Sequence, residues 1–325
     1  MKAVVCNALT GPTGLELVTL PDPAPADGEV LVAVAACGLN FFDTLITRGK
    51  YQFKPDLPFS PGGEIAGVIE AVGRGVDGWR PGDRVAAYIG WGGAQEKIAV
   101  DAARLIGIPD GVGEIPASAV SITYGTAIHG LRDRAMLLPG ESVAVLGASG
   151  GAGLAAVELA AAMGARVIAV ASSAEKLEVC RSHGAHDTID YSAGDLKIGL
   201  LDLTGGQGVD VVYDCVGGAS TEPALRALAW AGRYLVVGFA SGDIPQIPLN
   251  LLLLKGSSAI GVFWGESVRR DPAGHRANMS DVLGWVADGT LKARVDSTYP
   301  LERAALALRQ IDERKAVGKI VLTMK

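Results

Sequence analysis

The sequence predicts an α/β protein in which a doubly wound parallel sheet is joined to a β-rich domain. The first observation is a glycine-rich turn that links an apolar strand to an alanine-rich helix within residues 142–161. The second is a repeated alternation of strand-like and helix-like segments after this turn. The third is a series of short alternating runs, separated by Gly and Pro, before residue 124. With 325 residues, the chain is long enough for two domains.

The first part of the chain is rich in predicted strands. Met1–Cys6 begins as a strand and lacks the pattern of a signal peptide. The strand-like runs that follow are Glu29–Ala36, Ile65–Val72, Arg84–Tyr88 and Gln95–Val100. We therefore expect residues 1–123 to form a β-rich domain.

The glycine-rich turn is the most informative segment. The apolar run Ser142–Leu146 predicts a buried parallel strand, and the alanine-rich run after Gly153 predicts a helix. Glycines between them would let the main chain approach a phosphate at the helix N-terminus. Ala148 stands where the strict fingerprint has its first glycine, so a purely structural turn remains an alternative. The loop residues expected to bind a dinucleotide are Ser149, Gly150, Gly151, Ala152 and Gly153.

The alternation of strand-like and helix-like segments after this turn predicts the rest of the parallel sheet. The expected strands and helices, in chain order, are Arg166–Ala171, Glu175–His183, Val209–Val216, Thr221–Ala231 and Arg233–Phe239. We assign residues 124–263 to this nucleotide-binding unit. Residues 264–325 then predict two helices and a final strand, at Ala277–Ala287, Leu301–Glu313 and Lys319–Met324. A final strand needs a sheet to join, so we expect it to complete the first domain.

The end of the second predicted strand indicates which dinucleotide binds. NAD-binding sites place an acidic residue there, about 20 residues after the glycines, to accept the ribose hydroxyls. This chain has Ala171 at that place, followed by Ser172, Ser173 and Lys176. Two hydroxyls and an ammonium suit the additional 2′-phosphate of NADPH. The alternative is that one serine caps the next helix and Lys176 is solvated, and capping is compatible with phosphate binding.

Composition excludes several classes of function. The formal net charge of −6 gives no electrostatic basis for binding nucleic acid or an anionic membrane. No apolar stretch approaches the roughly 18 residues of a membrane span, so we expect a cytoplasmic protein. The four cysteines are scattered, without Cys-x-x-Cys spacing, and are expected to be small buried residues: Cys6, Cys37, Cys180 and Cys215.

A set of motifs in fixed order covers almost the whole chain. It comprises Ala36–Tyr51, Leu57–Gly67, Gly82–Val85, Tyr124–Ala127, Ala148–Gly153, Gly208–Asp214, Gly238–Ala240 and Gly261–Gly265. In this order they resemble the zinc-free quinone oxidoreductase branch of the medium-chain dehydrogenase/reductase superfamily, the zeta-crystallin-like proteins. The resemblance implies a GroES-like catalytic domain of residues 1–123 and 264–325, a Rossmann NADPH-binding domain of residues 124–263, and a homodimer.

The same motifs indicate that the chain has no catalytic metal. Zinc-dependent relatives have a cysteine at the position of Asn40, a histidine at that of Gly63, and a four-cysteine lobe after the segment that ends near Tyr88. A catalytic zinc needs about three protein ligands, and Glu64 alone remains in this region. We therefore expect no metal, and structural roles for the scattered histidines His129, His183, His186 and His275.

The resemblance implies hydride transfer from NADPH to a quinone or an α,β-unsaturated carbonyl, whose developing charge is delocalised without a metal. The catalytic candidates are Asn40, which would hold the substrate carbonyl or the nicotinamide ribose, and Tyr51, which would donate a hydrogen bond or a proton. A turn-stabilising Asn and a packed Tyr are the alternatives. Thr126 is expected near the nicotinamide, or else bonded to its own helix. The other expected cofactor contacts are Tyr191, Phe239, Ala240, Phe263 and Trp264.

Two other functions stay open. The first is a 2-enoyl thioester reductase of the same fold, which needs a basic patch; apart from Arg269–Arg270 the chain has no Lys or Arg cluster that suggests one. The second is a non-catalytic NADPH-binding protein, which a turnover assay would exclude. The expected partners are a small-molecule quinone or enone and a second copy of the chain.

Overall fold

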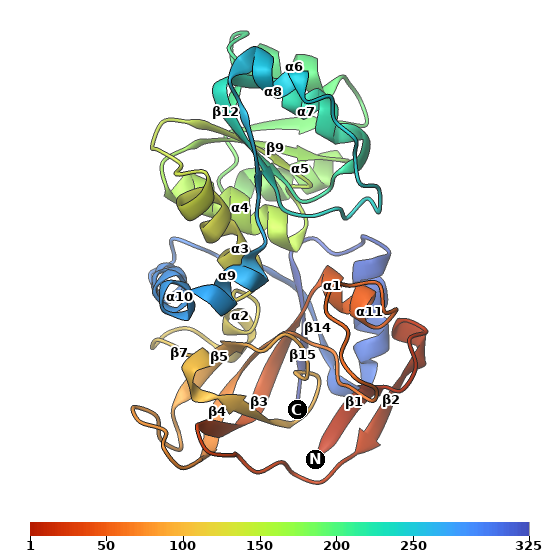
Figure 1. Ribbon diagram of the computed structural model, residues 1–325, viewed down its shortest axis with the longest axis vertical. Helices are drawn as coiled ribbons and strands as arrows, with labels where there is room; N and C mark the ends of the chain where they lie inside the picture. Colours follow the sequence, from red (N-terminus) through yellow and green to blue (C-terminus); the bar gives the residue numbers. More distant parts are fainter. Residues whose placement is uncertain (325) are drawn as a thin grey trace. The chain divides into compact units, whose positions relative to one another are not determined.

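The computed structural model describes residues 1–324, which form two compact units (Figure 1). The first unit contains Met1–Ile122, Asp271–Gly289 and residues 293–324. The second contains Thr123–Arg270 and Thr290–Lys292. The domain boundaries expected from the sequence, at residues 123/124 and 263/264, stay predictions.

A six-stranded parallel sheet forms the centre of the second unit. Its strands are β8 (Ser142–Leu146), β9 (Arg166–Ala171), β10 (Asp187–Asp190), β11 (Val209–Asp214), β12 (Leu228–Val236) and β13 (Ser258–Gly261). Their order in the sheet is β10-β9-β8-β11-β12-β13. The chain therefore runs from β8 to one edge of the sheet at β10, and then crosses to the opposite side of β8 to form β11, β12 and β13. Ligands of open α/β sheets bind beside such a reversal, here between β8 and β11. The predicted doubly wound parallel sheet is confirmed.

Helices cover this sheet by burying alternate side chains of its strands. The helices of the second unit are α3 (Thr123–Ile128), α4 (Gly151–Ala162), α5 (Ala174–Ser182), α6 (Leu196–Leu203), α7 (Thr221–Arg226), α8 (Asn250–Lys255) and α9 (Trp264–Arg270). One apolar cluster joins Val212 of β11 to Leu200 of α6 and Leu225 of α7, and these two helices lie together with α8 in Figure 1. The next residue, Tyr213, points to the other face and lies against Gly130.

The first unit contains a seven-stranded sheet and a two-stranded one. The smaller sheet pairs β1 (Lys2–Cys6) with β2 (Leu15–Thr19). The larger one contains β3 (Glu29–Leu39), β4 (Glu64–Val72), β5 (Arg84–Tyr88), β6 (Lys97–Asp101), β7 (Leu105–Gly107), β14 (Val295–Pro300) and β15 (Lys319–Thr323). In the larger sheet, β3 pairs with β4 on one side and with β15 on the other. The expectation that the final strand joins the N-terminal sheet is therefore confirmed.

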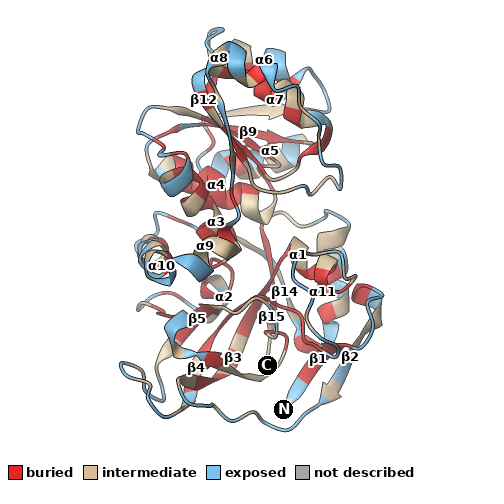
Figure 2. Ribbon diagram, in the orientation of Figure 1, coloured by how far each residue is buried: buried red, intermediate tan, exposed pale blue. Residues whose placement is uncertain are grey.

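Four helices belong to the first unit: α1 (Phe41–Ile46), α2 (Glu114–Ala117), α10 (Pro272–Ala287) and α11 (Ala304–Asp312). The main core lies where Leu308 of α11 packs with Ile65 and Val32 of the sheet, and buried residues line these strands in Figure 2. No helix within residues 1–324 combines the length and the apolar character needed to span a membrane.

Several predicted elements have other bounds in the structure, and for two of them local contacts explain the difference. The helix expected over Thr221–Ala231 ends at Arg226, and the chain from Leu228 forms β12 instead. Leu228 pairs with Val209, and Ala231 has a φ of +58°, which no residue inside a right-handed helix adopts. The strand expected over Val209–Val216 ends at Asp214, because the carboxylate of Asp214 accepts the N–H groups of Val216 and Gly217 and turns the chain.

Candidate active site

The parallel strands of the second unit end in one row. Leu146 of β8 is paired with Asp214 of β11, which is paired with Val236 of β12. Val236 is paired with Gly261 of β13, and Leu146 with Val170 of β9. The segments that follow these strands therefore meet at the carboxyl edge of the sheet. Among the predicted cofactor residues they include Ser149–Gly153, Ser172, Ser173, Lys176, Tyr191, Phe239, Ala240, Phe263 and Trp264.

The glycine loop turns at Gly147, which has a φ of +71°. A Cβ on Gly147 would lie 2.6 Å from Val216, and a Cβ on Gly153 would lie 2.2 Å from the Gly147 carbonyl oxygen. The fold itself therefore requires both glycines. At Gly150 a Cβ would make an ordinary 3.5 Å contact with the same oxygen, so packing does not require this glycine.

Gly150 is the N-cap of α4 and provides no capping side chain. The N-cap residue therefore has no side chain that could accept the first N–H groups of α4. Gly151 and Ala152 form the first turn of the helix, and Ser149 is buried just before it. Because the helix begins with the small residues Gly151, Ala152 and Gly153, its N-terminus leaves room for the pyrophosphate of a dinucleotide.

The turn between β9 and α5 brings Ser172, Ser173 and Lys176 together. Ser173 Oγ caps α5 by accepting the N–H of Lys176 at 3.4 Å, so the capping role exists. Lys176 Nζ donates to Ser172 Oγ at 3.3 Å, which holds the ammonium over the turn. Glu175 lies in the same turn, and hydrogen bonds from its own N–H and from Ser173 lower the pKa of its carboxyl. This carboxylate opposes the binding of a second anion here.

Other predicted cofactor residues follow neighbouring strands. The N–H of Tyr191 donates to the Ala171 carbonyl at 3.2 Å, and the Tyr191 side chain is exposed. The N–H of Ala240 donates to the Cys215 carbonyl at 3.2 Å, which fixes the Phe239–Ala240 segment beside the end of β11. Phe239 is 37% exposed and Phe263 50% exposed.

Thr126 and Trp264 lie deeper in the second unit. Thr126 is half-buried on α3, and its neighbour Gly125 faces the ring of Trp264. A Cβ on Gly125 would lie 2.8 Å from that ring, so the glycine permits the close approach. Trp264 is buried and supports the helix that carries Thr126.

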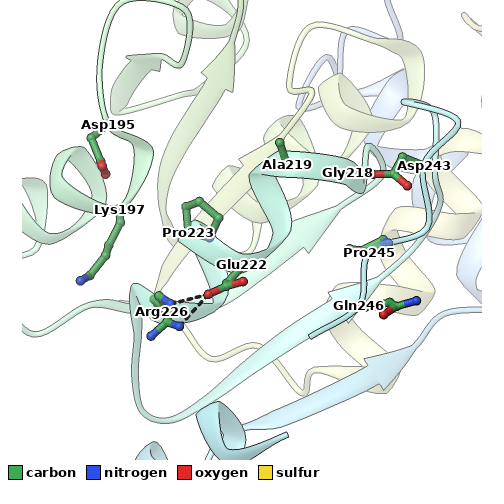
Figure 3. Close-up of a pocket in the computed structure, with 10 residues that line it drawn as sticks. All are labelled: Asp195, Lys197, Gly218, Ala219, Glu222, Pro223, Arg226, Asp243, Pro245 and Gln246. Atoms are coloured by element: carbon green, nitrogen blue, oxygen red, sulfur yellow. Dashed lines mark hydrogen bonds and ion pairs between the residues drawn. The ribbon is translucent and has the colours of Figure 1, made fainter. Parts of the chain in front are cut away.

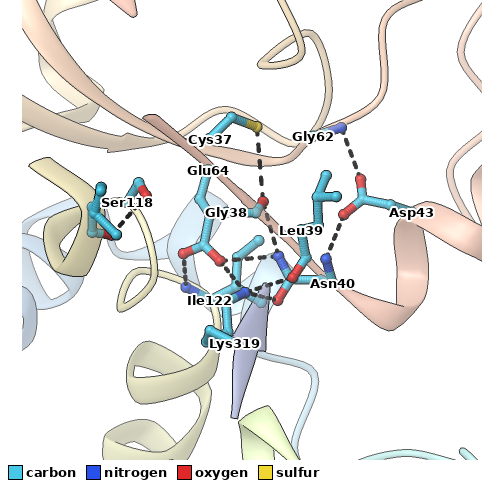
Figure 4. A network of polar contacts seen from close by, with 11 residues as sticks. Cys37, Gly38, Leu39, Asn40, Asp43, Gly62, Glu64, Ser118, Ile122 and Lys319 are labelled. Carbon is cyan, nitrogen blue, oxygen red and sulfur yellow. Dashed lines mark hydrogen bonds and ion pairs between the residues drawn. The ribbon is translucent and has the colours of Figure 1, made fainter. Parts of the chain in front are cut away.

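Three polar side chains are buried together in the first unit (Figure 4). Asn40 follows β3, Glu64 begins β4 and Lys319 begins β15. Lys319 Nζ donates to Asn40 Oδ1 and to Glu64 Oε1, both at 2.6 Å. Asn40 Nδ2 donates to Glu64 Oε1 at 2.9 Å, which closes the triangle. Asn40, the predicted catalytic residue, is therefore held by an internal ion pair.

Asp43 ties this triangle to the preceding loop. Its two carboxylate oxygens accept the N–H of Asn40 at 2.8 Å and the N–H of Gly62 at 2.9 Å. Burial raises the pKa of Asp43 to about 7, although both N–H donors and Lys319 act in the opposite direction. Sequence reasoning missed Asp43 and Lys319. A charged residue at the start of a final apolar strand is the one pattern that could have indicated Lys319.

The comparisons with known proteins identify the family. Two family models match: the alcohol dehydrogenase GroES-like domain over residues 26–110 and zinc-binding dehydrogenase over residues 151–286. The quinone oxidoreductase-like protein 2 homolog of Nematostella vectensis is 41% identical over 327 residues, covering 100% of this chain and 89% of the relative. The chain belongs to the quinone oxidoreductase branch of the medium-chain dehydrogenase/reductase superfamily.

Solved structures of the superfamily share its fold. The Escherichia coli quinone oxidoreductase complexed with NADPH has a TM-score of 0.90 at 29% identity, covering 99% of this chain and 100% of that one. CurK enoyl reductase has a TM-score of 0.88 at 26% identity, covering 100% and 99%. This quinone oxidoreductase-like chain is therefore an oxidoreductase with a GroES-like domain and a Rossmann domain, as the sequence predicts.

The residues of this family member do not fit a catalytic zinc. A Cβ on Gly63 would lie 2.4 Å from the Phe42 ring and 2.8 Å from the Gly90 carbonyl oxygen, which leaves no room for an imidazole. Glu64 is engaged by Lys319. Within residues 1–324, no group of three or more His, Cys, Asp or Glu side chains is placed to hold a metal ion.

Tyr51, the other predicted catalytic residue, belongs to an aromatic cluster in the first unit. Its ring centroid lies 5.4 Å from that of Phe42 and 6.0 Å from that of Phe53. Burial raises the pKa of the Tyr51 phenol, so the side chain is a neutral hydrogen-bond donor at physiological pH. No contact in the triangle of Asn40, Glu64 and Lys319 involves Tyr51.

The second unit also contains an open hollow of roughly 530 Å³ near α6 and α7 (Figure 3). The residues that line it are Asp195, Lys197, Gly218, Ala219, Glu222, Pro223, Arg226, Asp243, Pro245 and Gln246. Its lining includes both acidic and basic side chains, and Arg226 is paired with Glu222. It includes none of the predicted cofactor residues.

Proposed function

We propose that this chain is an NADPH-dependent reductase that transfers a hydride to quinones or α,β-unsaturated carbonyls without a metal. The observation that carries the proposal is the row of strand ends in the second unit. A glycine loop at a helix N-terminus, a Ser-Ser-Lys turn and exposed aromatic side chains all follow strands that end in this row. This combination matches the pyrophosphate, the 2′-phosphate and the nicotinamide of one cofactor.

Each part of NADPH has residues of this chain to hold it. The N–H groups of α4 after Gly150 would bind the pyrophosphate, and Lys176 with Ser172 and Ser173 would bind the 2′-phosphate. Tyr191 would flank the adenosine, and Thr126, Phe239, Ala240 and Phe263 would contact the nicotinamide side. When bound, NADPH supplies a hydride from C4 of its nicotinamide ring.

Residues of the first unit would act on the acceptor. We assign Asn40 to the acceptor oxygen, where negative charge develops and a positioned N–H donor stabilises it. Tyr51 would supply the proton that an enone needs at carbon, because its phenol stays neutral. No step uses a metal ion, since Gly63 and the paired Glu64 leave no ligand set.

A second reductase function has a specific observation in its favour. The fold and 26% identity that the chain shares with CurK enoyl reductase support a 2-enoyl thioester as acceptor. The same hydride would then reach a double bond conjugated with a thioester carbonyl. The third possibility, a protein that binds NADPH without turnover, uses the same cofactor residues.

An acceptor panel tests these functions against one another. Purified protein with NADPH is given a quinone, a short enone, an enoyl thioester or a saturated ketone, and the loss of nicotinamide absorbance is followed. We expect turnover with the quinone and the enone and none with the ketone. Tyr51→Phe should slow the enone more than the quinone, since solvent can protonate a reduced quinone. Preference for the thioester would indicate the second function, and NADPH binding without turnover would indicate the third.

We also propose a homodimer that forms through the outer edge of β13. This strand ends the six-stranded sheet, so one of its edges carries unpaired backbone groups. The side chains of Trp230, Leu249 and Leu253 are 77%, 75% and 80% exposed, and the Trp230 ring lies against Gly256 just before β13. Two such edges can pair about a twofold axis. We propose in addition the cytoplasmic location that is expected from the sequence.

A further inference from the structure

The buried triangle of Asn40, Glu64 and Lys319 uses every hydrogen-bonding group of its two charged members. An ammonium has three donors. Those of Lys319 go to Asn40 Oδ1, Glu64 Oε1 and the Leu39 carbonyl oxygen, the last at 2.8 Å. The second carboxylate oxygen of Glu64 accepts the N–H of Ile122 at 2.9 Å. The ion pair is thus fully engaged inside the first unit, with Glu64 0% and Lys319 4% exposed.

This arrangement fixes which way the Asn40 carboxamide faces. Its oxygen lies against the ammonium of Lys319, and its nitrogen lies against the carboxylate of Glu64. A flipped amide would place NH₂ against the ammonium and the oxygen against the carboxylate, so both contacts would become repulsive. One orientation of Asn40 is therefore selected by two charges of opposite sign.

One proton of the Asn40 amide remains weakly engaged. The Nδ2 group has two donors. One goes to Glu64, and the other has the Gly38 carbonyl oxygen at 3.5 Å, the outer limit of a hydrogen bond. The ammonium at Oδ1 draws electron density through the amide and makes this N–H a stronger donor.

The sheet topology builds this arrangement. β3 lies between β4 and β15, so Glu64 and Lys319 reach the end of β3 from opposite sides. Gly38 makes the close approach possible, because a Cβ there would lie 2.8 Å from Glu64 Oε1.

We propose that Glu64 and Lys319 are positioning residues that hold and polarise the Asn40 amide for its contact with the acceptor oxygen. This inference rests on the role of Asn40 in the proposed function. Removing one charge alone would leave the other buried without a partner, which destabilises a fold. The test therefore uses the double variant Glu64→Gln/Lys319→Met, which removes both charges and nearly conserves volume.

A double-mutant cycle separates positioning from general structure. kcat and KM for a quinone are measured for the wild type, Asn40→Ala, the double variant and the triple variant, with folding checked by thermal unfolding. We expect the double variant to lower kcat about tenfold or more with little change in KM. In the Asn40→Ala background the same change should have no further effect on kcat. Lys319→Arg, which keeps a cation beside Glu64, should retain more activity than the double variant.

The matched control is Glu70→Gln/Lys97→Met, which removes a Lys–Glu pair with a 2.9 Å contact in the same unit. It should leave kcat unchanged. An equal loss of kcat from the double variant with and without Asn40 would overturn the inference, and so would wild-type kcat in a folded double variant. Wild-type protein without acceptor-dependent turnover would instead contradict the proposed function, and the inference with it. Turnover in the wild type with wild-type kcat in Asn40→Ala would contradict the inference and leave the reductase function standing.

Discussion

Gly150 and Gly153 lie three residues apart at the start of α4, and the structure separates their roles. A side chain on Gly153 would meet the Gly147 carbonyl oxygen at 2.2 Å, whereas one on Gly150 would make an ordinary contact at 3.5 Å. Gly153 is therefore required for packing the helix on the strand, and Gly150 is available for the cofactor.

Alanine at each position should give opposite results. Gly153→Ala should reduce the free energy of unfolding by about 3 kcal/mol, because backbone atoms must move to admit the methyl group. Gly150→Ala should cost less than about 1 kcal/mol of stability but weaken NADPH binding about tenfold, since its methyl group crowds the pyrophosphate. Thermal unfolding and NADPH titration measure the two effects. Wild-type NADPH affinity in Gly150→Ala would contradict the assignment of the loop.

His275, buried on α10, links stability to pH. Burial lowers the pKa of its imidazole from 6.5 to about 4. Between these values the unfolded chain binds a proton that the folded chain does not, so stability falls as the pH decreases from 6.5 to 4. At pH 4 the lowered pKa of His275 reduces the free energy of unfolding by about 3 kcal/mol relative to its value above pH 6.5. His275→Gln should flatten this part of the curve of unfolding free energy against pH. An unchanged acid-side slope would show that His275 is not its source.

The resemblance to the family indicated part of the candidate site. Asn40 stood out because zinc-dependent relatives have a metal ligand at its position, and it does lie in a polar cluster. Its partner Lys319 is 279 positions away along the chain and reaches it through the pairing of β15 with β3. Local sequence patterns carry no information about such a pairing.

Among the elements, the β9–α5 turn is the one to which we assign the proposed choice of NADPH over NADH. Lys176 and Ser172 form a donor pair there, while Glu175 contributes a nearby negative charge. The proposed preference for NADPH therefore requires that the attraction of the Lys176 ammonium for the 2′-phosphate exceed the repulsion from the Glu175 carboxylate.

Lys176→Ala should weaken NADPH binding by about 1–3 kcal/mol and leave NADH binding almost unchanged, since the 2′-phosphate is what the ammonium contacts. Isothermal titration with both cofactors measures this. Lys197→Ala, which removes an exposed lysine of α6 in the same unit, is the matched control and should change neither affinity. If the wild type binds NADH as tightly as NADPH, the assignment of this turn fails.

The elements of the parallel sheet were predictable wherever an apolar run ended at a turn signal. β8 and β9 have the bounds expected from the sequence. The helix predicted over Thr221–Ala231 was too long because alanines favour helix locally, whereas pairing of Leu228 with Val209 draws the chain into the sheet. Short helices such as α1 and α8 were not predicted, since six residues are too few for a clear period.

At the scale of the whole molecule, the proposed dimer can be tested through one exposed side chain. Leu253→Glu should turn a dimer into a monomer, because a charge would then be buried at the interface. Ile198→Glu, at a residue that is 57% exposed on α6, is the matched control and should leave the dimer intact. Light scattering after size-exclusion chromatography measures the mass. A monomeric wild type, or a dimeric Leu253→Glu variant, would contradict the proposed interface.

The proposed hydride transfer from NADPH without a metal is best tested by the rate of NADPH oxidation by a quinone after exhaustive chelation. Gly63 and the Glu64–Lys319 pair leave no ligand set for a metal, so chelated protein should turn over at the rate of untreated protein. We expect saturable, quinone-dependent loss of NADPH that is faster than the loss of NADH. Loss of the rate on chelation, restored by zinc, would contradict the metal-independent mechanism. NADPH that binds but is not oxidised by any quinone would contradict the proposed reductase function.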